Sequence, residues 1–324
     1  MPHIYEYIWR DINGKFRSKT RVSDDVPTIW NYDGSSTGQA NTHNSEIELI
    51  PVKIVKDPFR ENSKLVLCET TAHNDTRSKA KEIFKHHVHQ NPMFGFEQEF
   101  FMILTETNAP LGWNHKAVHQ LPQKEFYCGV GSIHVHKSRV FLDDVLKKCL
   151  EAGLSITGYN YEVAIGQAEF QVCDIGIDAA DQLMLLRYIL ERTGELYGIM
   201  IEYHCKALGT EWNGSGLHTN FSTLIMRSLE DPSDRLKELL SAIEKLRDKH
   251  EEAIENYGHN NYLRLTGIHE TSSINKFTYG IADRSASIRI PRLTENQKYI
   301  EDRRPASDAD PYYVSSFIFK TVCF

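Results

Sequence analysis

The 324-residue sequence lacks most of the features that mark secreted, membrane-bound or nucleic-acid-binding proteins. Its six cysteines are dispersed without any Cys-x-x-Cys spacing, so neither a disulfide framework nor a zinc site is indicated. No apolar run approaches the roughly 20 residues needed to cross a bilayer, and the first residues do not resemble a signal peptide. A net charge of −7 does not favour binding to nucleic acid or anionic membranes. We therefore expect a cytoplasmic protein with no nucleic-acid or membrane partner.

The spacing of apolar residues predicts an α+β protein, because strands dominate its first part and alternate with helices afterwards. Alternation predicts strands at 5–10, 15–22, 46–51 and 64–69, with a hairpin turn at 11–14. Helical spacing, with start and stop residues, predicts helices at 75–90, 143–154, 179–197 and 233–257. We place a domain boundary between residues 75 and 76.

Six residues in strand-like motifs point to chemistry, and they are Glu97, Glu99, Glu162, Glu169, His218 and Glu301. Side chains alternate along a strand, so Glu97 and Glu99 project from the same face of an otherwise apolar segment. Glu162 and Glu169 are seven residues apart, and they share a face only if the chain bulges or turns at Gly166.

The histidine motif has a polar face. His218 shares that face with Asn220 and Ser222, and Gly214 and Gly216 just before it allow a ligand to approach the backbone closely. Carboxylates on the inner side of a strand are costly to bury without a cation. Oxygen-rich clusters with one imidazole suit magnesium or manganese better than zinc or copper. Each motif alone also fits a solvated acidic pair or a histidine with a structural hydrogen bond.

A second set of residues is basic, and it consists of Arg264, Arg284, Arg289, Arg303 and Arg304. The planar guanidinium group suits bidentate contact with carboxylate and phosphate, although each arginine alone also fits a structural salt bridge. Beside a carboxylate cage for metals, several arginines indicate phosphoryl transfer. The sequence has neither a Walker-type loop nor a kinase-type Gly-rich loop, so a nucleotide must be bound by another architecture.

Seven motifs occur in the order typical of one enzyme family, and together they span most of the chain: 30–39, 94–99, 127–131, 213–222, 264–272, 286–292 and 301–306. With them the sequence resembles glutamine synthetase, specifically the eukaryotic-type (type II) branch. The resemblance implies ATP-dependent ligation of ammonia to the γ-carboxylate of glutamate through γ-glutamyl phosphate. It also implies a small β-grasp-like domain at 1–75, followed by a catalytic domain at 76–324 with a curved antiparallel sheet, a half-barrel backed by helices.

The resemblance assigns the acidic residues to two metal sites, with two or more Mg²⁺ or Mn²⁺ ions per active site and ATP as co-substrate. One site, near glutamate and ammonium, would be formed by Glu99, Glu162 and Glu169. The other, near the ATP phosphates, would be formed by Glu97, His218 and Glu301.

The resemblance also implies roles for the remaining motif residues. Arg284 and Arg289 would stabilise the transferring phosphoryl group, Glu270 would be the flap residue, and Asp33 and Ser36 would complete the ammonium site of a neighbouring subunit. Glutamate would be bound by Arg264, Arg303, Asn213 and Gly214, and ATP by Asn220, Ser222, Tyr299, Arg284 and Arg289. Self-association, in a ring of ten by resemblance, follows from active sites shared between adjacent subunits.

The sequence departs from the family pattern in the nucleotide region and at both ends. Met93 stands where the family often has Trp, and Cys173–Asp174 replaces a usual Gly-Pro. The usual amino-terminal helical extension is absent, and the chain ends soon after Tyr313, so the ring of ten is less secure. Two alternatives stay open: a catalytically silent homologue with a structural or regulatory role, and a γ-glutamyl ligase for another amine. The intact metal ligands argue against the first, and the compact Asp33–Ser36 pocket argues against the second.

Overall fold

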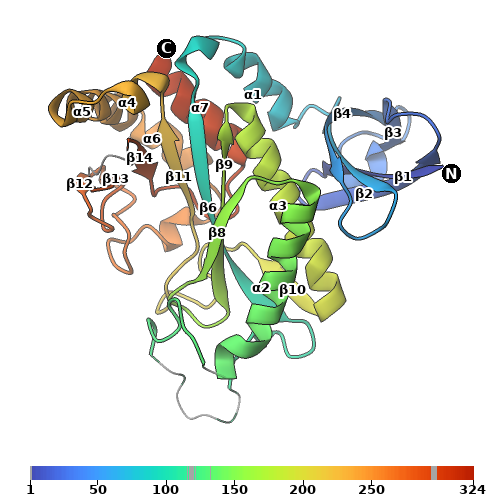
Figure 1. The fold of residues 1–324 in the computed structure, drawn as a ribbon, viewed down its shortest axis with the longest axis horizontal. Helices are drawn as coiled ribbons and strands as arrows, with labels where there is room; N and C mark the ends of the chain where they lie inside the picture. The colour runs from blue at the N-terminus through green and yellow to red at the C-terminus, as the bar shows by residue number, and fades with distance from the viewer. Residues whose placement is uncertain (1, 115, 117–119, 121, 132, 293–297) are drawn as a thin grey trace.

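The computed structural model describes residues 2–114, 116, 120, 122–131, 133–292 and 298–324, which form an α+β fold with two sheets. The small sheet lies at the amino-terminal end of the molecule, and the large sheet with its helices forms the rest (Figure 1). The α+β class predicted from the sequence is therefore confirmed.

The small sheet has the strand order β2-β1-β5-β4-β3. Its strands are β1 (His3–Arg10), β2 (Phe16–Ser23), β3 (Trp30–Asp33), β4 (Glu46–Lys56) and β5 (Ser63–Thr70). The β1–β2 hairpin and the two later strands occur where the sequence predicted them. Tyr5, Tyr7 and Trp9 alternate along β1 into the core of the small sheet, whereas Ile8 faces the core of the larger part. Because both faces of β1 are covered, the small sheet packs firmly on the rest of the chain.

The large sheet has the order β12-β13-β14-β11-β6-β9-β8, with β7 and β10 also paired to β6. Its strands are β6 (Met93–Leu104), β7 (Ala109–Pro110), β8 (Ile156–Tyr161), β9 (Gln167–Ile175), β10 (Ile199–Glu202), β11 (Leu217–Ser222), β12 (Tyr279–Ile281), β13 (Ile288–Ile290) and β14 (Ile300–Asp302). All pairs are antiparallel except β12 with β13. The sheet curls around one face, as expected for a half-barrel.

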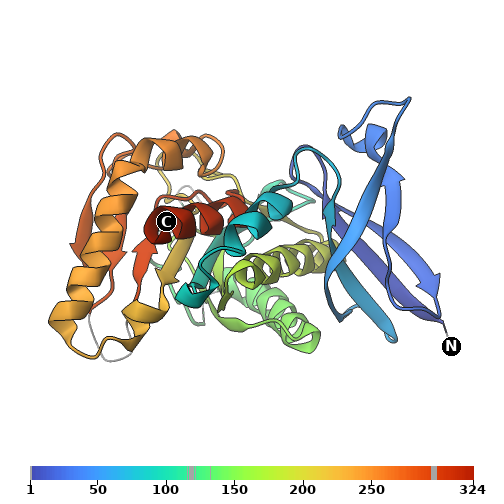
Figure 2. The ribbon, with the colours of Figure 1, turned by 90° about the horizontal axis from the view of Figure 1, so that it is seen from above.

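Helices cover the other face of the large sheet, where α3 packs against β6, β9 and β10, and α7 packs against α1, α3 and α5 (Figure 2). The helices are α1 (Thr76–Phe84), α2 (Ile133–Ala152), α3 (Ile177–Tyr197), α4 (Leu224–Ser228), α5 (Pro232–Asp248), α6 (His250–Asn256) and α7 (Pro311–Cys323). Within the described residues, no helix has the length and apolarity that a membrane crossing requires.

Three predicted helix boundaries were wrong. The helix predicted at 75–90 ends at Phe84, because His87 and Asn91 adopt left-handed backbone angles around a short 3₁₀ turn. The helix predicted at 233–257 is broken at Lys249, which leaves the helical conformation. The helix predicted at 143–154 begins ten residues earlier, and Phe141 within the added part is fully buried.

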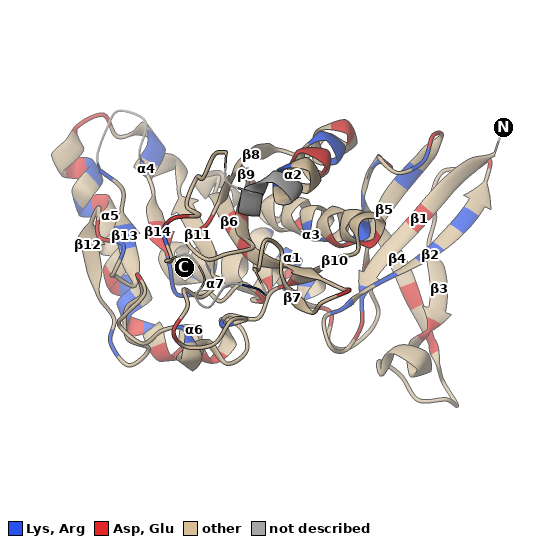
Figure 3. Ribbon diagram, turned by 90° about the horizontal axis from the view of Figure 1, so that it is seen from below, with Lys and Arg blue, Asp and Glu red and all other residues tan. Residues whose placement is uncertain are grey.

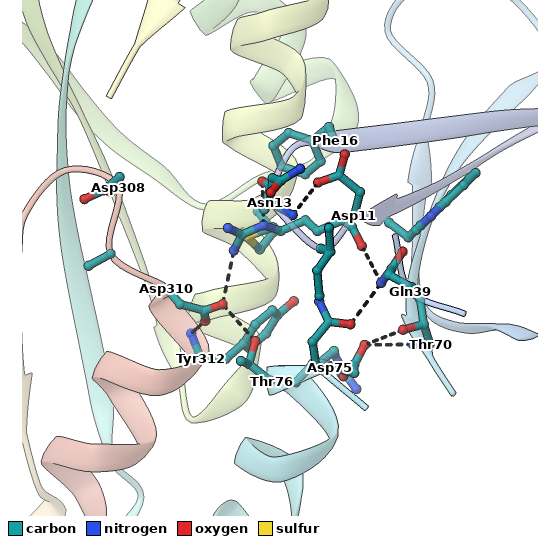
Figure 4. A pocket seen from close by; sticks show the side chains of 18 of the residues that line it. Asp11, Asn13, Phe16, Gln39, Thr70, Asp75, Thr76, Asp308, Asp310 and Tyr312 are labelled. Atoms are coloured by element: carbon teal, nitrogen blue, oxygen red, sulfur yellow. Dashed lines mark hydrogen bonds and ion pairs between the residues drawn. The ribbon is translucent and has the colours of Figure 1, made fainter. Parts of the chain in front are cut away.

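Ion pairs and hydrogen bonds join the small sheet to the helices of the larger part. Arg77 on α1 donates to Glu69 on β5 and to Asp181 on α3, at 2.9 and 2.8 Å. Asp310, the N-cap of α7, accepts from Arg10 at 3.1 Å and from Thr76 at 2.8 Å (Figure 4). These contacts border a cavity of about 550 Å³ between the small sheet and the rest of the molecule. The start of α7 is thus fixed to both parts.

Candidate active site

The register of the large sheet brings the predicted metal ligands together. Glu97 on β6 lies opposite His218 on β11, and Glu99 on β6 lies opposite Glu169 on β9. At the next strand, Glu301 on β14 lies opposite Asn220 on β11. These cross-strand neighbours face the same side of the sheet, because residues two apart in a strand share a face. In Figure 3, acidic positions on β14 lie beside a basic position on the neighbouring strand β13.

Two groups of these side chains have the spacing of metal ligands. Glu97, His218 and Glu301 offer ligand atoms within 4.8 Å of one another, and so do Glu99, Glu169 and His218. The Nδ1 atom of His218 lies 3.6, 3.7 and 3.8 Å from carboxylate oxygens of Glu97, Glu99 and Glu301. The first group is the same trio that the resemblance assigns to one metal.

Glu162 reaches the cavity from a turn. The chain turns at Gly166, with φ of 72°, so that β8 and β9 run side by side and Glu162 and Glu169 line one cavity. Gly166 is suited to this backbone angle because it has no Cβ. The Glu162 carboxylate accepts from Asn160 at 3.0 Å, and it lies outside both ligand groups.

The electrostatics of the cluster fit a divalent cation. Burial raises the pKa of Glu99 to about 8 and that of Glu162 to about 7, and it raises the pKa of Glu169 well above its usual value. Burial also lowers the pKa of His218 well below its usual value, so a neutral ring nitrogen is available as a ligand. A cation among these carboxylates would offset the repulsion that raises their pKa values. The donor set of several carboxylates and one imidazole therefore fits magnesium or manganese.

Arginines line the same cavity beside the carboxylates. Glu301, fully buried, pairs with both Arg289 and Arg303, and its Oε1 atom is 2.6 Å from Nη1 of Arg303. Arg284 and Arg264 also line this cavity, whose volume is about 190 Å³. Arg304, by contrast, does not line this cavity and pairs with Asp302 at 2.7 Å, so we assign it a structural role.

Arg264 is held firmly at the floor of the cavity. Its Nη2 atom donates to the carbonyls of Arg303, Arg304 and Pro305 at 3.1, 2.8 and 2.8 Å. Burial lowers its pKa to about 10, so the guanidinium stays charged at neutral pH. Gly214 packs directly on its side chain: a Cβ at this position would lie 2.8 Å from Cγ of Arg264. The cavity floor at this point therefore requires glycine.

The loop that carries Glu270 is strained and anchored. His269 and Glu270 both have left-handed backbone angles, with φ of 54° and 63°, and both line the acidic cavity. Arg303 donates to the carbonyl of Glu270 at 3.3 Å and to that of Arg284 at 3.1 Å. One arginine thus joins Glu301, the Glu270 loop and the Arg284 loop.

A second, more apolar cavity of about 560 Å³ adjoins the first, and the two share Glu97, Gln171 and Tyr299. It is lined by the residues expected at the nucleotide, including Asn220, Ser222, Met93 and Cys173. The Oδ1 atom of Asn220 is buried without a hydrogen-bond partner. An unpaired buried acceptor is costly, which is consistent with a ligand that donates to it.

Asp33 and Ser36 lie on the small sheet and do not line either cavity of their own chain. Asp33 caps a short 3₁₀ helix (Gly34–Thr37), and its carboxylate accepts from the hydroxyls of Ser35 and Ser36 at 2.7 Å each. These hydrogen bonds lower the pKa of Asp33 to about 2, so its exposed carboxylate is ionised at neutral pH.

Some cavity residues received no role in the sequence analysis. Gln171 donates to Glu169 at 2.7 Å, and Asn160 donates to Glu162. Both lie two residues from the glutamate they contact, so strand alternation alone could have identified them. Tyr127, His269 and Thr271 also line the acidic cavity, but they come from loops, where no periodic signal exists.

Comparisons with known proteins agree with this geometry. The family described as glutamine synthetase, catalytic domain, matches residues 73–323. Glutamine synthetase from Panulirus argus is 44% identical, covering 98% of this chain and 92% of its own length. The cytosolic isozyme from Daucus carota is also 44% identical, covering 98% and 94%. A cryo-EM structure of Plasmodium falciparum glutamine synthetase superposes with a TM-score of 0.80 at 18% identity, covering 99% of this chain and 71% of that one.

Proposed function

The chain belongs to the glutamine synthetase family, and we propose a role for each of its active-site residues in the family's reaction. It is a glutamate–ammonia ligase, which forms glutamine from glutamate and ammonia with ATP. The observation that carries the proposal is the convergence of carboxylates and arginines in one cavity that opens into a second, larger one.

Two divalent ions, Mg²⁺ or Mn²⁺, would be held in the acidic cavity. Glu99, Glu162 and Glu169 hold the one nearer glutamate, and Glu97, His218 and Glu301 hold the one nearer ATP. The spacing of the second trio and the neutral His218 ring support this assignment. When bound, such ions would offset the negative charge of the transferring phosphoryl group.

ATP would occupy the larger cavity with its phosphates toward the shared residues. Asn220 and Ser222 face the nucleoside, and Tyr299 lies where the two cavities meet. Arg284 and Arg289 line the acidic cavity. Their charge would offset that of the γ-phosphoryl group as it passes from ATP to glutamate. Transfer gives γ-glutamyl phosphate, in which the carboxylate has gained a good leaving group.

Glutamate would be bound by Arg264 and Arg303, with Asn213 and Gly214 shaping the site. The Nε and Nη2 atoms of Arg264 donate to protein acceptors, while its Nη1 atom lies beside Gly216, 3.2 Å from where a Cβ would be. The fixed guanidinium groups position the amino acid without reorganising.

Ammonium would be bound and deprotonated by Glu270 of one subunit with Asp33 and Ser36 of the next. An ionised, exposed Asp33 outside its own cavity supports a role in a neighbouring one. Residues 1–75 would then act as the domain that delivers this loop, and residues 76–324 as the catalytic domain, within a ring of ten subunits. Closing the Glu270 loop keeps water from the acyl phosphate. We place this activity in the cytoplasm.

The direct test measures phosphate release from ATP with glutamate and either ammonium or larger amines. Release only with ammonium supports the proposal. Release with larger amines supports a different γ-glutamyl ligase, and no release with any amine supports a silent homologue.

Sharing of active sites is tested by mixing subunits. Asp33→Ala and Glu270→Ala inactivate different halves of a shared site, so co-assembled mixtures should regain part of the activity that each variant lacks alone. Mixtures as inactive as the separate variants would refute a shared site.

A further inference from the structure

A buried arginine lies on the face of β6 opposite the metal ligands. Arg187 on α3 is 4% exposed, and its Nε atom donates to Oε1 of Gln98 at 2.7 Å. Its Nη2 atom donates to the carbonyls of Ser307 and Ala309 at 2.9 and 3.0 Å. The guanidinium thus ties the helix layer to β6 and to the segment 303–309 (termed the strap), which runs from Arg303 in the cavity to the start of α7.

Gln98 connects Arg187 to Glu99 through hydrogen bonds. Its Nε2 atom donates to the Glu99 carbonyl at 2.8 Å and to the Ser307 carbonyl and hydroxyl at 3.1 and 2.9 Å. The Ser307 hydroxyl donates to the same Glu99 carbonyl. On the other side, the Glu99 carboxylate accepts from the Gly216 amide at 2.7 Å, and the Glu99 amide donates back to the Gly216 carbonyl. Glu99 is therefore held through its carbonyl, its amide and its carboxylate.

The far end of the strap is fixed as well. Asp310, next to Ala309, accepts from Arg10 on the small sheet and from Thr76 on α1 (Figure 4). The carbonyls that Arg187 binds therefore belong to a segment with little freedom to move, and Gln98 is held against a firm support.

Stability alone does not explain Arg187. Within the described residues no carboxylate forms an ion pair with it, and burial lowers its pKa below the usual value. The ring of Tyr203, 5.3 Å from the guanidinium carbon, gives it a cation–π contact. Glu191, one turn along α3, is close enough for its charge to interact with that of Arg187, but it makes no direct ion pair. A buried charge with no carboxylate in direct contact is costly, and an apolar side chain of similar size often serves stability as well or better. What an apolar side chain cannot provide is the set of directed hydrogen bonds to Gln98 and the strap.

We propose that Arg187 is a positioning residue that acts through Gln98 to fix Glu99 in the metal cluster. This inference rests on the proposed role of Glu99 as a metal ligand. Outer partners of metal ligands typically contribute about 10- to 100-fold in metal affinity. Loss of Arg187 should therefore weaken the metal site that contains Glu99 and spare the site formed by Glu97, His218 and Glu301.

The test is a titration of the metal-free protein with Mn²⁺ by isothermal calorimetry. Arg187→Met and Gln98→Met each remove one part of the chain of contacts, and the double variant removes both. Arg235→Met is the matched control, because Arg235 is also 4% exposed and also donates only to carbonyls, those of Leu229 and Glu230. Near-ultraviolet circular dichroism checks the fold of each variant, and Gln98→Met carries the test if Arg187→Met does not fold.

We expect one of two Mn²⁺ sites to weaken about 10- to 100-fold in Arg187→Met and in Gln98→Met, with no larger effect in the double variant. Arg187→Lys should recover part of the loss, and Arg235→Met should bind both ions normally. Unchanged Mn²⁺ binding in folded Arg187→Met, or an equal loss in Arg235→Met, overturns the inference. Glu99→Gln separates the two proposals: if it leaves Mn²⁺ binding unchanged, the ligand assignment fails, whereas a loss there without one in Arg187→Met rejects only the role of Arg187.

Discussion

Removal of the divalent ions should make the stability of the protein fall as the pH rises from 6 to 8. The pKa of Glu99 is about 8 and that of Glu162 about 7 in the metal-free fold, against about 4.5 for an unfolded chain. Between these values the folded protein binds more protons than the unfolded chain. The free energy of unfolding therefore decreases with pH across this window. The extra stability relative to high pH is complete below about pH 4.5 and is lost as each carboxylate ionises.

The size of the effect follows from the same pKa values. Between pH 6 and 8, ionisation of Glu99 lowers the free energy of unfolding by about 2 kcal/mol and that of Glu162 by about 1 kcal/mol. Because the two carboxylates share one cavity, their combined effect of about 3 kcal/mol is not a simple sum. Glu169, whose pKa is also raised, adds to the fall in stability, and His218, whose pKa is lowered, opposes it. Metal binding requires ionised ligands, so added Mg²⁺ should stabilise the protein more at pH 8 than at pH 6.

Urea unfolding at pH 6, 7 and 8, with EDTA or with excess Mg²⁺, measures both trends. Glu99→Gln is the matched variant, since its side chain cannot ionise and it should reduce the pH dependence in EDTA by the share that Glu99 contributes. A metal-free protein that is equally stable at pH 6 and pH 8, or more stable at pH 8, would refute the electrostatic reasoning. So would a stabilisation by Mg²⁺ that is larger at pH 6.

Three further predictions concern the substrates. Gly214→Ala places a Cβ 2.3 Å from the Cys205 carbonyl oxygen and should displace Arg264. Steady-state kinetics should then show the KM for glutamate raised about tenfold or more, with the KM for ATP little changed. An unchanged KM for glutamate would contradict this prediction. Glu270→Ala should sharply lower glutamine formation while calorimetry shows normal binding of a non-hydrolysable ATP analogue, and normal synthesis would reject the flap role. Met93→Trp adds a stacking surface for adenine worth about 1–3 kcal/mol, so the Kd of the same analogue should fall about tenfold; a weaker or equal affinity would show that adenine does not lie there.

Local sequence patterns predicted four of the five strands of the small sheet, missing β3, and the shared face of Glu97 and Glu99. They could not predict that Glu97 would pair with His218, because cross-strand register over 120 residues depends on the whole sheet. That pairing was expected only through the family resemblance. The break at Lys249 was also hidden, since neither Gly nor Pro marks it.

The positions of the acidic residues show what the sequence pattern alone cannot predict. His218 belongs to both ligand groups, whereas Glu162 accepts a hydrogen bond from Asn160 and lies outside them. A residue at the end of a strand has more freedom than one within it, so Glu162 is the ligand whose position depends most on what fills the cavity. The sequence pattern alone can indicate which face of the sheet Glu162 is on, but not how far its carboxylate lies from the other ligand atoms.

The strained loop at His269 and Glu270 is physically connected to the residues proposed to bind metal and glutamate. Two successive non-glycine residues, His269 and Glu270, hold left-handed angles that cost on the order of 1–2 kcal/mol each. Such a conformation persists only where other contacts hold it in place. Here Arg303 provides such a contact, because it donates to the Glu270 carbonyl while it pairs with Glu301. A group that draws Glu301 away from Arg303 therefore also acts on the loop that carries Glu270. If Glu301 binds metal and Glu270 is the flap residue, as proposed above, Arg303 links metal binding to closure of the flap.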